Sequence, residues 1–117
     1  MGVNMSIPTP IELDAPCCSS IRECSVRSLV VIGFRGKPKI LREIRAVRCS
    51  RGITKKVKFY PSNDVILASY YVSNRGVHHI NILWKPEDIP NQQATEIVRK
   101  ALGIALEEKV SVIVSTS

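Results

Sequence analysis

The sequence is poor in aromatic side chains and has no long apolar run. Two Phe, three Tyr and one Trp make up 5% of its 117 residues, too few for the aromatic sheet surface of a typical RNA-recognition domain. No uninterrupted apolar run is longer than Leu29–Ile32, whereas a membrane-spanning helix needs about 20 apolar residues. Residues 1–15 have neither a basic start nor an apolar block, so no secretory signal is expected. We therefore expect no membrane partner and a cytoplasmic location.

Motifs for catalysis and metal binding are also absent. The chain has no CxxC pair, no GxxxxGK[ST] phosphate loop and no RNP-type sequence. His78 and His79 are neighbours in a predicted strand, so they face opposite ways and cannot act together. No second carboxylate is placed beside Asp64, as two-metal hydrolysis would need. The sequence predicts a non-enzymatic protein with no catalytic residue, no metal site and no cofactor.

The four cysteines leave two alternatives open. They stand at Cys17, Cys18, Cys24 and Cys49, and their spacing fits no zinc pattern. A disulfide such as Cys24–Cys49 is one alternative, especially in a hyperthermophile, where intracellular disulfides occur. Free thiols are the other, and the spacing does not decide between them.

Positive charge is concentrated in the first half of the chain. The net charge is +7, and the segment from Arg22 to Lys58 holds twelve basic residues against two acidic ones. A block of one sign creates a directed field that attracts a polyanion, most commonly nucleic acid. The alternative is a solvated basic surface with no ligand.

The apolar pattern predicts a short list of elements after an irregular N-terminal arm, residues 1–24. Residues 25–117 are predicted to form a single domain that begins with a strand over 25–34. Ile40, Leu41, Ile44 and Val47 follow the spacing of one helical face, which predicts a basic helix over 38–50 with Pro38 in its first turn.

Three strands are predicted next, over 54–60, 65–72 and 77–84, and turn residues between them indicate an antiparallel meander. A second helix is predicted from Asn91, as its capping residue, to Glu108, and a last strand over Val110–Val114. The predicted fold class is therefore α+β, a mainly antiparallel sheet in the order strand, helix, three-strand meander, helix, strand. Two helices pack on that sheet.

Alternation along the predicted strands assigns side chains to faces. Lys56, Lys58 and Tyr60 share a face opposite Val57 and Phe59. Tyr70 and Tyr71 must face opposite ways, and we expect Tyr71 to be the exposed one. Ile80, Ile82 and Trp84 share a face, which favours a core role for the only tryptophan.

Together these features predict a surface that binds single-stranded nucleic acid, with DNA favoured over RNA. Cations would contact phosphates with little sequence preference, and flat side chains would stack on bases. The candidate site residues are Lys37, Lys39, Arg42, Arg45, Arg48, Lys55, Lys56, Lys58, Tyr60, Tyr71 and His79. The alternative function is an assembly subunit that docks through its basic face in a ribonucleoprotein or a protein complex.

The chain resembles the ThermoDBP-related archaeal single-stranded DNA-binding proteins in its composition and in its predicted element order. It is short, is rich in Val, Ile and Arg, and has only two Gln. The resemblance covers about Arg27–Leu106. It implies a thermophilic archaeal source and a basic, partly apolar cleft formed by an antiparallel sheet and helices. Uncovered strand edges and the apolar helix predicted over 91–108 also favour a homo-oligomer.

Overall fold

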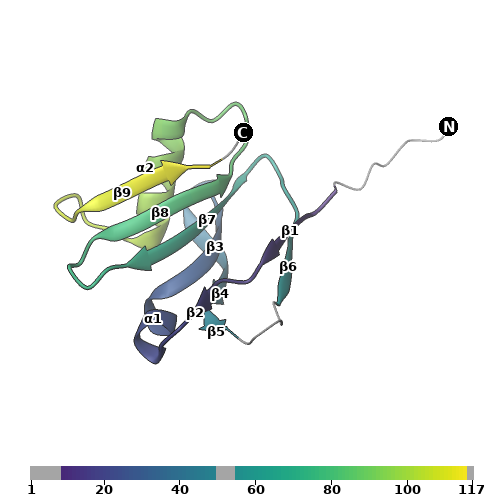
Figure 1. The fold of residues 1–117 in the computed structure, drawn as a ribbon. Helices are drawn as coiled ribbons and strands as arrows, with labels where there is room; N and C mark the ends of the chain where they lie inside the picture. The colour runs from purple at the N-terminus through teal and green to yellow at the C-terminus, as the bar shows by residue number, and fades with distance from the viewer. Residues whose placement is uncertain (1–8, 50–54, 116–117) are drawn as a thin grey trace.

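The computed structural model describes residues 9–49 and 55–115. Strands predominate over helices, and the fold class is α+β, as expected. The elements are β1 (Ile11–Asp14), β2 (Cys17–Cys18), α1 (Ile21–Val26), β3 (Arg27–Gly33), β4 (Lys39–Arg45), β5 (Val47–Arg48), β6 (Lys56–Phe59), β7 (Val65–Val72), β8 (His78–Trp84), α2 (Asn91–Leu102) and β9 (Val110–Val114) (Figure 1).

The main sheet has five strands in the order β4-β3-β7-β8-β9. All neighbours are antiparallel except β8 and β9, which are parallel. The segment Val65–Val72, which is largely apolar on both faces, forms the central strand, as its sequence predicts. Two further pairs, β1 with β6 and β2 with β5, lie beside this sheet.

One face of the main sheet is covered by α2. Alternate residues of β3, β7 and β8, among them Ile32, Ile66 and Ile82, form one core cluster with buried residues of the helix such as Val98. Helix α2 lies behind the sheet in Figure 1 and connects the parallel strands β8 and β9. We call this the covered face.

The opposite face is covered over only part of its area. The antiparallel pair β1–β6 packs Val57 and Phe59 against Leu29 and Leu67, and these residues form a second core cluster. This cluster occupies the end of the sheet where β3 ends and β7 begins. The other end of the face carries no packed element among the described residues.

The helix predicted over 38–50 is wrong, because Lys39–Arg45 form β4 and Val47–Arg48 form β5; residue 50 lies outside the described part. The cause is a β-bulge, since the β3–β4 register shifts between Val31 and Ile32 and leaves Leu41 as the extra residue. An extra residue breaks the alternation of a strand, so its apolar positions imitated helical spacing. The charged residues of β4 are exposed because β4 is an edge strand, and not because they lie on the polar face of a helix.

The predicted meander is wrong in its first strand. β6, predicted over 54–60, pairs with β1 and not with β7, and residue 54 lies outside the described residues. β7 pairs instead with β3, from Arg27 with Tyr71 to Gly33 with Val65. The β7–β8 hairpin and the final strand Val110–Val114 are as predicted.

Residues 9–24 are not an irregular arm; residues 1–8 lie outside the described part. β1 supplies Ile11 and Leu13 to the second core cluster. Helix α1 begins after Ser20, whose side chain accepts a hydrogen bond from the Glu23 backbone N–H, while Glu23 accepts one from the Ser19 N–H. The Ser-x-x-Glu spacing of Ser20 and Glu23 is the sequence signature of this capping arrangement. Of the two helices in residues 9–49 and 55–115, only α2 covers a face of the sheet.

Helix α2 is shorter than predicted. It ends at Leu102, and Gly103 adopts a left-handed conformation with φ 71°, from which its N–H reaches carbonyls of the last turn. The helix therefore ends six residues before Glu108. Pro90, and not Asn91, is the N-cap residue, and no side chain caps this end.

Trp84 is part of the core but not on the face predicted for it. The β7–β8 register shifts between Leu67 and Ala68, so Trp84 pairs with Leu67 while Ile82 pairs with Ala68. The bulge turns the Trp84 ring to the second core cluster, where its centroid lies 5.7 Å from that of Phe59. Among the described residues, no helix is long and apolar enough to cross a membrane.

All four cysteines are in disulfides, and the suggested Cys24–Cys49 pairing is wrong. Cys17 bonds to Cys49 and Cys18 to Cys24. Neighbouring residues of a strand point opposite ways, so the two vicinal cysteines reach different partners. These bonds tie β2 to the residue after β5 and to α1.

The Cys17–Cys49 disulfide should contribute more stability than the Cys18–Cys24 disulfide. Their sequence separations are 32 and 6, and loop-closure entropy predicts losses of roughly 4 and 2 kcal/mol when the bonds are removed. Urea unfolding followed by Trp84 fluorescence compares Cys17→Ser/Cys49→Ser with Cys18→Ala/Cys24→Ala. Equal losses, or the reverse order, would contradict this assignment of roles.

Candidate functional site: an uncovered sheet face with a ring stack

Four neighbouring strands place one row of side chains across the uncovered part of the sheet. The pairings Arg27 with Tyr71, Tyr71 with His79, and His79 with Ser111 define this row. Paired residues of adjacent strands point to the same face, so the four side chains stand side by side. We call this area the open face. Two predicted site residues, Tyr71 and His79, meet here.

The flat groups of this row form a stack. The Tyr71 and His79 rings are 4.6 Å apart between centroids with an interplanar angle of 10°. The Arg27 guanidinium carbon lies 4.7 Å from the centroid of the Tyr71 ring, a cation–π contact. The stack ends at His79, because Ser111 on β9 is exposed and has no ring. A further flat group has room to continue it above Ser111.

The open face is hollowed on both sides of Arg27 and Tyr71. One cavity of about 330 Å³ extends over β8 and β9, and it is lined by Arg27, Ser69, Tyr71, His79, Ile80, Asn81, Ser111 and Ile113. A second cavity of about 330 Å³ extends toward α1 and includes Arg22 and Asn74. Because the two cavities share Arg27 and Tyr71, they form adjoining parts of one surface.

Arg27 is held in place by α1. Its Nη2 lies 3.3 Å from Glu23 Oε1. Hydrogen bonds from Ser19 and, less strongly, the charge of Arg27 lower the pKa of the Glu23 carboxyl. Arg27 Nε is buried and has no hydrogen-bond partner in the described part of the chain. Arg27 is not among the site residues predicted from the sequence, although the Glu23–Arg27 spacing of four residues is a signal for such a pair.

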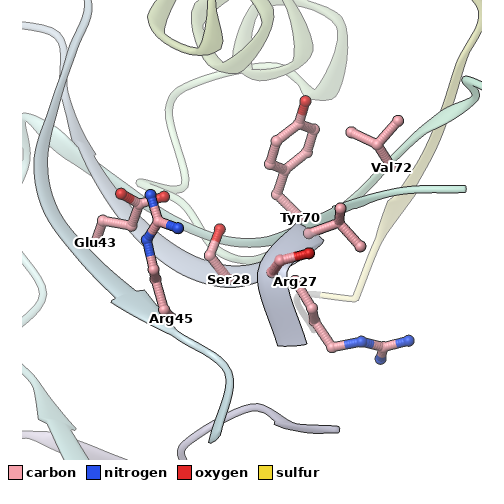
Figure 2. A pocket seen from close by; sticks show the side chains of 8 residues that line it. Arg27, Ser28, Glu43, Arg45, Tyr70 and Val72 are labelled. Carbon is pink, nitrogen blue, oxygen red and sulfur yellow. The ribbon is translucent and has the colours of Figure 1, made fainter. Parts of the chain in front are cut away.

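Tyr70 lies on the other face of β7, as alternation predicts. Figure 2 shows the Tyr70 ring pointing to one side of the sheet and the Arg27 side chain to the other. On the Tyr70 side, a cavity of about 220 Å³ is lined in part by Ser28, Glu43 and Arg45. Arg45, a predicted site residue, is therefore separated from the stack by the sheet.

The two histidines also have separate environments. His78 Nδ1 lies 2.7 Å from the Tyr70 hydroxyl, and its Nε2 lies 3.3 Å from Glu108 Oε1. These partners fit a ring protonated at Nε2, which donates to Glu108 and accepts from Tyr70. Burial, and then the charge of Glu108, raise the pKa of the Tyr70 hydroxyl. This network fixes the turn before β9 to the covered face.

The other predicted cations do not gather at the stack. Lys39 pairs with Gly33 at the end of β3 remote from Arg27, a distance of about 20 Å along a strand of this length. Lys37 precedes it in the turn. Arg42 shares the face of Val31, its partner in the β3–β4 pairing. Arg48 lies in β5, outside the main sheet.

The basic side of β6 is opposed by the acidic side of β1. Lys56 Nζ lies 2.6 Å from Asp14 Oδ1, and Lys58 is paired in register with Glu12. The hydrogen bond to Asp14 and that residue's charge raise the pKa of Lys56. Lys55 is exposed just before β6, and Tyr60, 55% exposed, follows it. Neither lines the hollows at the stack.

The described residues contain no group of three His, Cys, Asp or Glu side chains able to hold a metal ion. In comparisons with known proteins, no family model, no curated protein and no solved structure matches the chain. The chemistry of the open face therefore carries the functional argument alone. It offers two stacked rings, one guanidinium, several hydroxyl and amide groups, and the apolar edge of Ile113.

Replacing Glu108 by Gln should lower the melting temperature at neutral pH more than at pH 3. The hydrogen bond from the Ala105 N–H, followed by the one from His78, lowers the pKa of Glu108 below its ordinary value of 4.5. The ionised carboxylate therefore stabilises the fold above pH 4.5, and this contribution is lost as the pH falls through the lowered value.

Thermal melts of both proteins at pH 7 and pH 3 measure the effect. Glu108→Gln keeps an oxygen acceptor for the Ala105 N–H. Acid-induced losses of stability at other groups occur in both proteins and cancel in the comparison. The same melting-temperature gap at both pH values would show that the Glu108 charge contributes nothing.

Proposed function

We propose that this protein is a non-enzymatic binder of single-stranded nucleic acid, and that bases stack at the open face. The observation that carries the proposal is the Arg27–Tyr71–His79 stack, on the part of the sheet face that β1–β6 leaves uncovered. Unpaired bases have exposed π-faces, and stacking on an aromatic side chain contributes about 1–3 kcal/mol per base. Since every base has such a face, this binding tolerates different sequences.

Polar groups beside the stack suit the edges of bases. Ser69, Asn81 and Ser111 line the same hollow as His79. The Asn81 side-chain oxygen accepts a hydrogen bond from the Ser115 hydroxyl at 2.6 Å. No described residue accepts from the Asn81 amide nitrogen, which therefore retains two N–H donors for a ligand.

Electrostatic attraction has a smaller role in this proposal than in the sequence-based one. The net charge of +7 still favours the approach of a polyanion. However, the predicted cations lie on several surfaces, and Lys56 is paired with Asp14. Arg27 and Arg22 are the cations that line the hollows at the stack. We therefore assign few phosphate contacts to each binding site.

The expected cytoplasmic location and thermophilic archaeal source stay predictions, as does the preference for DNA over RNA. Two disulfides in an intracellular protein are typical of hyperthermophiles and unusual elsewhere. The disulfides are therefore compatible with that source. The resemblance to the ThermoDBP-related proteins points to the same function without assigning residues.

Tyr71→Ala should weaken binding of a labelled oligothymidylate about 10-fold or more, because the ring lies at the centre of the stack. His79→Ala should have an effect of similar size. Tyr60→Ala is the matched control, since its ring is exposed in the residue after β6 and lines neither hollow at the stack. Fluorescence anisotropy at low salt measures all four proteins. Equal weakening by Tyr60→Ala, or no binding at all, would overturn the proposal.

The salt dependence of the same binding separates the two models of the interface. Two phosphate contacts, from Arg22 and Arg27, predict a slope of about −1.4 for log K against log salt, because each contact to a single strand contributes about −0.7. Contacts from all eight cations of the sequence-based site predict a slope of about −5.6. A slope near the second value would show that the basic surface, and not the stack, dominates binding.

A further inference from the structure

The outer edge of β9 is the remaining unexplained feature of the sheet. Among the described residues, no strand pairs with it. Its sequence, Val-Ser-Val-Ile-Val, has no charged residue, and the Ile113 side chain is 62% exposed. The other edge strand, β4, is guarded by four charged residues and by a bulge, the usual protections against edge pairing. β9 has neither protection.

The hydrogen bonds at both ends of β9 show which backbone groups point outward. The His78 N–H donates to the Lys109 carbonyl, and the Ser115 N–H donates to the Ile82 carbonyl, each at 2.9 Å. Residues with odd numbers therefore direct their N–H and C=O groups to β8. Alternation then points those of Val110, Val112 and Val114 away from the sheet.

We propose that β9 pairs antiparallel with β9 of a second copy of this chain, across a two-fold axis at Val112. This register matches Val112 with Val112 of the partner subunit, and Val110 with Val114 of the partner subunit. Every matched residue in these pairs has outward N–H and C=O groups, so each pair exchanges two hydrogen bonds. The two main sheets then form one continuous sheet.

A second copy fits this edge better than an unrelated strand, because the edge is complementary to itself under that rotation. All outward backbone groups are used in the Val112-centred register, whereas a shift of the axis by one residue leaves some of them unpaired. The valines meet on the covered face, and no charged side chain from within β9 enters the contact. A two-fold interface of this kind is closed and does not extend into a fibre.

The pairing also completes the open face. In this register Ser111 lies opposite Ile113 of the partner subunit, on the same face as His79. Ile113 of the partner subunit would then form an apolar wall beyond Ser111, facing the side of the His79 ring that Tyr71 does not cover. This consequence rests on the proposed function, whereas the dimer itself does not. The two His79 rings would lie on one surface, about 16 Å apart, because three strand spacings and an offset of two residues along the strands separate them.

Sedimentation without nucleic acid tests the dimer separately from the binding proposal. The native chain should sediment as a dimer, and Val112→Pro as a monomer, because the lost N–H points away from β8 and Pro is tolerated at such edge positions. Ile113→Lys should also give monomers while changing only an exposed side chain, and a cooperative thermal melt would show that it folds. A native monomer, or a dimer unaffected by Ile113→Lys, would overturn the proposal.

Cysteine cross-linking tests the register. Ser111→Cys and Ile113→Cys are made separately, and all four native cysteines are already paired. A mixture of the two variants should form an intermolecular disulfide under mild oxidation, because matched residues on antiparallel strands lie within disulfide reach. Each variant alone should cross-link much less. Equal cross-linking of either variant with itself would overturn the Val112-centred pairing.

Discussion

The structure depends on the unequal covering of the two faces of one sheet. Burial of Val30, Ile32, Ile66 and Ile82 against α2 fixes which side chains of each strand point to the core. Because side chains alternate along a strand, Tyr71 and His79 must then lie on the other face. The β1–β6 pair covers one end of that face, where it packs on Leu29, Leu67 and their neighbours such as Val31. The ring stack stays accessible because this second layer is short.

Charge along the chain and charge in space differ in this protein. The segment from Arg22 to Lys58 is strongly basic, which suggested one continuous binding surface. In the fold, β1 brings Asp14 against Lys56 and Glu12 opposite Lys58, while Arg45 lies on the covered face near Glu43. The proposed binding therefore relies less on many cations and more on the Arg27 guanidinium, which lies between Glu23 and the Tyr71 ring.

Local patterns predicted the elements that are buried and regular. Val65–Val72 and Val110–Val114 are rich in β-branched and other apolar residues, and their bounds follow from that composition. Bulges at Leu41 and before Trp84 made two predictions from periodicity wrong, the helix over 38–50 and the face of Trp84. One extra residue reverses the alternation that follows it. The partner of β6 could not be predicted by proximity, since β1 lies more than forty residues earlier in the chain.

The site was partly predictable for the same reason. Alternation predicted that Tyr71 lies on the face opposite Tyr70, and His79 on the face opposite His78, but not which face is open; their pairing follows from the β7–β8 hairpin register. Arg27 was missed because its role depends on α1 and on a cross-strand pairing with β7. The end of the stack at Ser111 depends on the parallel placement of β9, which no local pattern indicates.

The most direct test of stacking at the open face uses the two histidines, which lie on opposite faces of β8. The imidazole proton signals of His78 and His79 can be followed by NMR while a short oligothymidylate is added. Stacking of bases on His79 predicts upfield ring-current shifts for His79 and little change for His78 behind the sheet. Shifts of equal size at both rings, or an unmoved His79 in a saturated complex, would contradict it.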